Sequence, residues 1–108
     1  MNNLKGQVAL VTGAGRQNGI GAAIARRLAQ DGADVVVSDL WAPPAVLPHG
    51  GNPSWEELES VAEEITAFGG DCVPIRADVT VADEVQAMFA TTKEKFGRLD
   101  ILINNAGA

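Results

Sequence analysis

The chain has 108 residues, 46% of them hydrophobic and 20% charged, a composition typical of one soluble globular domain with a modest core. Its formal net charge of −6 argues against nucleic acid or an anionic membrane surface as a partner. No apolar run approaches the roughly 20 residues that span a bilayer, residues 1–6 lack the layout of a secretory signal, and a single cysteine, Cys72, excludes an internal disulfide. We therefore expect a cytoplasmic protein.

The first element along the chain is a strand predicted over residues 7–12, buried on both faces because its apolar run, residues 8–11, does not alternate. A glycine-rich loop follows, and a helical pattern opens at Gly19. Ile20, Ile24 and Leu28 recur at every fourth position with Ala23 beside them, so we expect these residues to form the buried stripe of the helix. The pair Asp31-Gly32 predicts its C-terminal end.

A strand, a glycine loop and a helix N-terminus in this order can bind an anion, because backbone N–H groups and the positive end of the helix dipole point at the ligand. Gly13 and Gly15 supply the first two glycines of the dinucleotide fingerprint G-x-G-x-x-G, whereas Asn18 holds the third place and glycine returns at 19 and 21. A loop that merely reverses the chain remains the alternative interpretation.

A second buried strand is predicted over residues 35–38, closing on Asp39, which completes a β-α-β unit with a parallel, right-handed crossover. Residues 40–53 are rich in proline and glycine and predict a long loop that includes Trp41 and His49. We interpret the loop as a mobile, exposed linker, with a shield over a ligand or a subunit contact as alternatives. His49 has no ligand-type partner nearby, so no metal site is predicted.

A second helix is predicted from the capping box Ser54–Glu57 to Gly69-Gly70. The third strand, residues 72–75, contains Pro74, which cannot donate to a β-ladder and therefore predicts an edge strand. Thr80 is expected to cap a third helix that ends at Gly97, before a fourth strand over residues 100–103. The apolar stripes expected on these two helices are Trp55, Leu58, Val61, Ala62 and Ile65, and then Val81, Val85, Met88, Phe89 and Phe96.

The alternation of strands and helices predicts the α/β class, as a partial doubly wound parallel sheet of the Rossmann type with strand order 3-2-1-4. Ligands in such sheets bind at the carboxyl ends of the strands, where the strand order reverses. Gly13, Asp39, Asp78 and Asn105 each follow the carboxyl end of a different predicted strand. This coincidence favours a nucleotide site over a plain glycine turn.

Asp39 lies about twenty residues beyond the glycine loop, where a carboxylate can accept hydrogen bonds from the ribose of an adenosine. A negative charge there repels a 2′-phosphate, which favours NAD over NADP as cofactor. Arg16 argues in the other direction, because a guanidinium in the loop could pair with that phosphate. A solvated arginine and a solvated aspartate are the plain alternatives.

Several motifs together resemble the short-chain dehydrogenase/reductase family, and the resemblance covers the whole chain. They are Thr12-Gly13-Ala14-Gly15-Arg16 with Gly19-Ile20-Gly21, then Asp39, Asp78-Val79 and Asn104-Asn105-Ala106-Gly107. The family's T-G-x-x-x-G-x-G is matched with two additional residues, so Arg16, Gln17 and Asn18 are alternatives for the residue that faces the cofactor.

The resemblance implies that the backbone around Ile20 binds the pyrophosphate of the cofactor, that Asp78 and Val79 contact its adenine, and that Asn105 braces the sheet. The cofactor site predicted in this way, with the loop residues included, consists of Gly13, Gly15, Arg16, Asn18, Gly19, Ile20, Gly21, Asp39, Asp78, Val79, Asn105, Ala106 and Gly107.

Members of this family transfer hydride to or from an alcohol or carbonyl substrate with a serine, a tyrosine and a lysine, and this chain contains no tyrosine. We therefore expect residues 1–108 to be the N-terminal part of one NAD(P)-binding domain, without catalytic residues and marginally stable alone. The resemblance also implies a dimer or tetramer. A non-catalytic nucleotide-binding or interaction module is the alternative.

Overall fold

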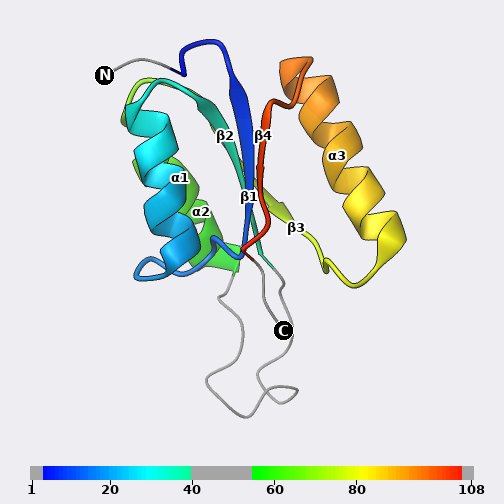
Figure 1. The fold of residues 1–108 in the computed structure, drawn as a ribbon. Coiled ribbons are helices and arrows are strands. Elements are labelled where there is room, and N and C mark those ends of the chain that lie inside the picture. The colour runs from blue at the N-terminus through cyan, green and yellow to red at the C-terminus, as the bar shows by residue number, and fades with distance from the viewer. Residues whose placement is uncertain (1–3, 40–54, 106–108) are drawn as a thin grey trace.

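The structure is a computed structural model that describes residues 4–39 and 55–105. Strands and helices alternate along the chain (Figure 1). In order, the elements are β1 (Val8–Thr12), α1 (Ile20–Gln30), β2 (Asp34–Asp39), α2 (Trp55–Thr66), β3 (Cys72–Arg76), α3 (Ala82–Phe96) and β4 (Ile101–Ile103). Each strand and each helix lies where the sequence pattern predicts one.

The strands form one parallel sheet in the order β3-β2-β1-β4, which confirms the predicted α/β class and strand order. Val8 is in register with Asp34, and Leu10 with both Val36 and Leu102. All strands therefore end at the same edge of the sheet. β3 lies at the outer edge beside β2, as Pro74 predicts.

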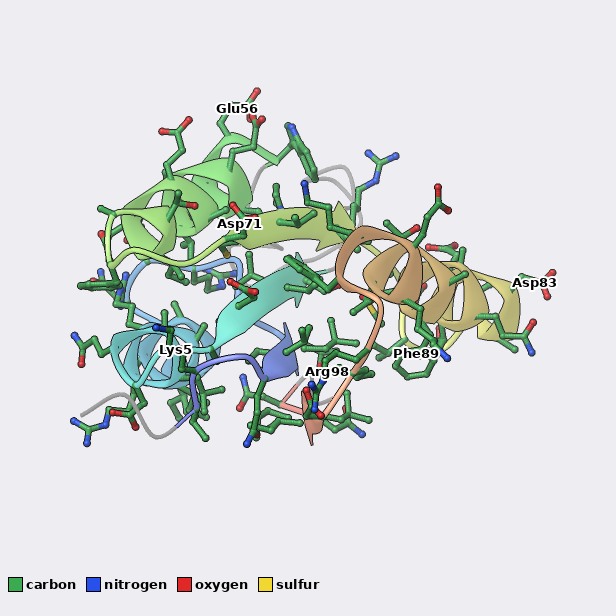
Figure 2. All side chains as sticks on the ribbon, turned by 90° about the horizontal axis from the view of Figure 1, so that it is seen from above. Lys5, Glu56, Asp71, Asp83, Phe89 and Arg98 are labelled. Carbon is green, nitrogen blue, oxygen red and sulfur yellow. The ribbon has the colours of Figure 1, made fainter. Side chains whose placement is uncertain are left out.

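Helices cover both faces of the sheet. α1 and α2 lie together on one face and α3 lies on the other, as the ribbon and the view from above both show (Figures 1 and 2). The larger core cluster joins α1 and α2 to β1 and β2 through residues such as Val11, Val35 and Ile65. The smaller cluster packs Met88 of α3 on Leu10 and Val36. The β1 and β2 runs are unbroken because both faces are buried.

The buried face of α1 differs from the predicted one. Ile20 is 73% exposed and Ala23 is exposed as well, while Ile24 and Leu28 are half-buried at the margin of the core. The residues that face the sheet are the small ones, Gly21, Ala22, Ala25 and Ala29. Small side chains let the helix axis approach the sheet closely, and the larger side chains are displaced to its flanks.

The ends of α2 and α3 also differ from the prediction. α2 ends at Thr66, three residues before Gly69, although its predicted stripe is confirmed with Trp55 half-buried. The N-cap of α3 is Val81 and carries no side-chain cap. Thr80 is not the cap, because its hydroxyl donates to Oδ1 of Asp78 at 2.6 Å. Val81 is consequently exposed instead of packed in the stripe.

Two side chains, Asp100 directly before β4 and Cys72 on the edge strand β3, have shifted pKa values. Asp100 accepts the N–H of Val8 at 2.8 Å and pairs with Arg98, which holds its pKa below the ordinary value. Cys72 on β3 packs against the larger core cluster, and burial raises the pKa of its thiol to about 12. The thiol is therefore protonated at neutral pH and behaves as a small apolar side chain.

Some sequence predictions concern residues outside the described ranges. They are the loop over residues 40–53 with Trp41 and His49, the capping residue Ser54, and the site residues Ala106 and Gly107. Within residues 4–39 and 55–105, no helix is long and apolar enough to cross a membrane. The same two ranges contain no cluster of three or more histidine, cysteine or acidic side chains that could hold a metal ion.

Candidate functional site

The predicted site residues meet at the carboxyl edge of the sheet. Gly13 follows β1 directly, Asp39 is the last residue of β2, and Asn105 follows β4 by two residues. β1 and β4 are hydrogen-bonded neighbours on one side, and β1 and β2 on the other. From β1 the chain proceeds to β2 and β3 on one side of the sheet and then returns to β4 on the other side of β1. The strand order therefore reverses beside β1, and open α/β sheets bind ligands at such a point.

The N-terminus of α1 lies at this edge and has no side-chain cap. Gly19, its N-cap residue, makes no capping hydrogen bond, and the first turn of the helix contains no acidic residue. The N–H groups of Ile20, Gly21 and Ala22 have no intrahelical partner, as in the first turn of any α-helix. The positive end of the helix dipole is therefore available for an anion.

Two glycines bring this helix end against the end of β1. A Cβ atom on Gly21 would lie 2.4 Å from the carbonyl oxygen of Gly13 and 2.8 Å from Nδ2 of Asn105. Gly13 itself has a φ of +68°, a backbone conformation that side chains disfavour. Glycine is thus required at both positions for the loop and the helix to make this approach.

The carboxylate of Asp39 lies against the glycine loop. Its Oδ2 accepts the N–H of Gly15 at 2.8 Å, and the neighbouring loop residue Ala14 donates its N–H to the carbonyl of Ser38 at 2.9 Å. The loop is thereby fixed to the end of β2. The Asp39 carboxylate therefore lies at the carboxyl edge of the sheet, beside the loop.

The end of β4 is joined to the end of β1 through Thr12 and Asn105. The hydroxyl of Thr12, a buried side chain, accepts the N–H of Asn105 at 3.1 Å and lies 3.4 Å from the carbonyl of Ile103. Nδ2 of Asn105 donates to the carbonyl of Gly13 at 3.3 Å. Asn105 therefore braces the sheet at the strand ends, as the resemblance implies.

The remaining predicted site residues lie around this edge. Arg16 and Asn18 are exposed on the loop. Asp78 lies between β3 and α3, where its carboxylate accepts the hydroxyl and the N–H of Thr80; these hydrogen bonds hold the pKa of Asp78 below the ordinary value. Val79 is partly exposed and lines a shallow apolar pocket together with Thr12.

The sequence did not predict a network of polar side chains that includes the loop residue Gln17. Gln17, Arg26, Glu57 and Ser60 form a hydrogen-bonded network that joins the loop, α1 and α2. Gln17 is 40 residues from Glu57 along the chain, so no local sequence pattern predicts the contact. The side chain of Gln17, one of the three alternatives for the residue that faces the cofactor, is directed at α2.

These features fit a nucleotide diphosphate. Gly13 and Gly21 bring the end of α1 against the end of β1, the first turn of α1 supplies N–H donors, and the Asp39 carboxylate lies beside the loop. A parallel doubly wound sheet with such a loop after β1 defines an α/β protein of the Rossmann type.

Residues 7–108 match the family model described as short chain dehydrogenase, and the chain belongs to this family. It is 43% identical over 107 residues to a 3-oxoacyl-(acyl-carrier-protein) reductase of Synechocystis sp., which covers 99% of this chain and 38% of the relative. The structure matches a short chain dehydrogenase from Mycobacterium smegmatis with a TM-score of 0.81 at 38% identity, covering 100% of this chain and 40% of that one.

The structure also matches carveol dehydrogenase from Mycobacterium avium in complex with NAD, with a TM-score of 0.88 at 31% identity, covering 100% of this chain and 38% of that one. The chain thus spans about two fifths of the length of the relatives it matches. Among proteins of this family, NAD(P)-dependent oxidoreduction is the general activity.

Proposed function

We propose that this chain binds the adenosine diphosphate half of NAD within an oxidoreductase that transfers hydride between the nicotinamide and an alcohol or carbonyl substrate. The single observation that carries the proposal is the uncapped, acid-free N-terminus of α1, held against β1 by Gly13 and Gly21. The NAD complex of the carveol dehydrogenase, whose fold this chain shares, supports it. NAD, when bound, supplies the hydride acceptor of the reaction.

Each residue at the carboxyl edge has a distinct role in the proposal. The N–H groups of Ile20 and Gly21 bind the diphosphate, and Gly13, Gly15 and Gly19 allow its close approach. Asp39 accepts hydrogen bonds from the ribose, while Asp78 and Val79 contact the adenine. Asn105 keeps the ends of β1 and β4 together, and Ala106 and Gly107 complete the adenosine side.

The preference for NAD over NADP rests on charge. The Asp39 carboxylate is fixed beside the loop by Gly15, so a 2′-phosphate on the ribose would meet a like charge at short range. Arg16, exposed on the loop, is the residue that could favour NADP instead. We assign the larger effect to Asp39 because its position is set by the end of a strand.

We also propose that the chain is the N-terminal part of a larger domain that supplies the proton-transfer residues. The chain aligns with about two fifths of each relative and contains no tyrosine, the residue expected to exchange the proton with the substrate. The alternative is a nucleotide-binding module without activity. A homo-oligomeric state and a cytoplasmic location stay predictions.

The proposal is tested by titrating the full-length protein with NAD and with NADP. We expect NAD to bind more tightly, and Asp39→Asn, which keeps an acceptor oxygen for Gly15 but removes the charge, to reduce the preference about tenfold. Asp34→Asn is the matched control, because Asp34 lies at the opposite end of the same strand. Tighter binding of NADP by the unchanged protein would refute the cofactor assignment. Nucleotide binding without alcohol or carbonyl turnover would favour the non-catalytic module.

A further inference from the structure

Gln17 is the most heavily hydrogen-bonded residue of the glycine loop. Its N–H donates to Oε2 of Glu57 at 2.9 Å, and its side-chain Nε2 donates to Oγ of Ser60 at 2.7 Å. Its carbonyl oxygen and its Oε1 both accept hydrogen bonds from Nη2 of Arg26, at 2.9 and 2.7 Å. Each polar atom of Gln17 is therefore engaged, although the residue lies in a loop of three glycines between β1 and α1.

Arg26 joins the loop to the second helix. Its Nε donates to Oε1 of Glu64 on α2, while its Nη2 holds Gln17. Three quarters of the Arg26 side chain is removed from solvent, whereas the side chain of the neighbouring Arg27 is 74% exposed and pairs with Asp31. The two arginines thus differ in burial and in partners despite their adjacent positions on α1.

The partners on α2 are themselves fixed. Ser60, which accepts from Gln17, donates its own hydroxyl to the carbonyl of Glu57 at 2.7 Å. Glu57, Ser60 and Glu64 recur at spacings of three and four, so they occupy one face of α2. The hydrogen bonds from Gln17 and Arg26 reach this face, and α2 lies beside α1 on the same side of the sheet (Figure 1).

We propose that Gln17 and Arg26 are positioning residues of the cofactor site, which tie the lengthened glycine loop to α2 and so hold the first turn of α1 ready for a diphosphate. This inference rests on the proposed function. A loop with several glycines loses much conformational entropy when a ligand orders it, and this loss weakens binding. The network orders the loop before the cofactor arrives, although neither side chain has to touch the nucleotide.

The test compares dissociation constants for NAD and ADP-ribose in the full-length protein with Gln17→Ala, Arg26→Ala and the double variant. We expect each single variant to weaken binding of both ligands about tenfold, as for the loss of charge-assisted hydrogen bonds. The double variant should be no weaker than the weaker single variant, because both changes release the same loop. Arg26→Lys should not restore affinity, since one ammonium group cannot span Gln17 and Glu64.

Arg27→Ala is the matched control and should bind both ligands as the unchanged protein does. The unfolding temperature of the ligand-free variants separates positioning from stability, because a merely structural role lowers this temperature without changing affinity in the cold. Unchanged affinity in Gln17→Ala or Arg26→Ala overturns the inference alone. Absence of NAD binding to the unchanged protein overturns the proposed function and this inference with it.

Discussion

The N-termini of α1 and α3 lie at the same edge of the sheet but are built in opposite ways. α1 begins after β1 with no acidic residue in its first turn. α3 begins after β3 with Asp83 and Glu84 in its first turn, and Oε1 of Glu84 accepts the N–H of Asp78 at 2.9 Å. Asp83 points outward from the end of α3 (Figure 2). The first turn of α3 thus contains two carboxylates of the chain itself, and the first turn of α1 contains none.

The difference between the two first turns favours α1 over α3 as the helix end that binds the diphosphate in the proposed function. Acidic residues in a first turn stabilise a helix through its dipole, so their absence from α1 forgoes that stabilisation. α2 follows the pattern of α3, with Glu56 and Glu57 in its first turn. Glu57, however, extends to the N–H of Gln17 in the loop. Among the three described helices, α1 alone has a first turn without an acidic residue, which agrees with the proposed diphosphate site.

The largest expected effect is on the approach of α1 to β1. In Gly21→Ala, the new methyl group would overlap the backbone of Gly13 and Nδ2 of Asn105, and these atoms cannot move independently of the strand ends. We expect a loss of about 3 kcal/mol in the free energy of unfolding and no measurable NAD binding. Denaturant unfolding and titration calorimetry measure both.

Ala23→Ser, on the exposed side of the same helix, should leave NAD binding unchanged. Wild-type stability in Gly21→Ala would show that the contact between the helix end and β1 is looser than described.

An intermediate effect is expected when α1 is given the charge that α3 already has. Ile20 is 73% exposed, so Ile20→Asp adds a carboxylate to the first turn without disturbing the core. The helix dipole should stabilise the fold by about 0.5 kcal/mol. Repulsion of the diphosphate should raise the dissociation constant for NAD about tenfold. Stability and affinity would therefore change in opposite directions.

The uncharged variant Ile20→Asn is the control for size and polarity. The reverse change, Asp83→Asn on α3, should lower stability slightly and leave the affinity for NAD unchanged. Equal NAD affinity in Ile20→Asp and Ile20→Asn would remove α1 from the diphosphate site.

The smallest effect concerns the acid titration of Asp78 beside α3. The hydroxyl and the N–H of Thr80 stabilise the ionised carboxylate, which lowers its pKa in the folded state. The resulting stabilisation is present above the ordinary pKa, near 4, and is lost as the pH falls through the lower folded value. Thr80→Val removes the larger of the two hydrogen bonds, so the titration midpoint of Asp78 should rise in an NMR experiment. An unmoved midpoint would show that the Thr80 hydroxyl does not hold the carboxylate.

The fold could be predicted from the sequence because each strand has a recognisable pattern within a few consecutive residues. Residues 8–11 and 35–37 are apolar runs without alternation, a pattern typical of strands buried on both faces. Pro74 predicted the edge strand for an equally local reason, its missing N–H. The buried face of α1 was predicted wrongly because Ile20 and Leu28 are more hydrophobic than alanine and were therefore expected in the core. The close approach of Gly21 to Gly13 instead favours small side chains between the helix and the sheet.

The site was only partly predictable for a related reason. Gly13, Asp39 and Asn105 are recognisable because each follows the end of a strand, and the structure brings them to one edge of the sheet. The roles of Gln17 and Arg26 depend on the position of α2, which begins almost 40 residues after the loop. Contacts of this kind follow from helix packing, which no spacing of residues within the loop encodes.

Pro74 has a consequence for how this sheet can extend. The bonds from Val35 N to the carbonyl of Asp71 and from Ala77 N to the carbonyl of Asp39 set the alternation along β3, which turns the backbone of Pro74 away from β2. Its outward position offers no donor to an incoming strand, so this border is protected against edge-to-edge aggregation. On β4 (Ile101–Ile103), where Leu102 is 50% exposed, the described residues include no proline. Within the described part of the chain, a further strand can therefore pair more readily with β4 than with β3.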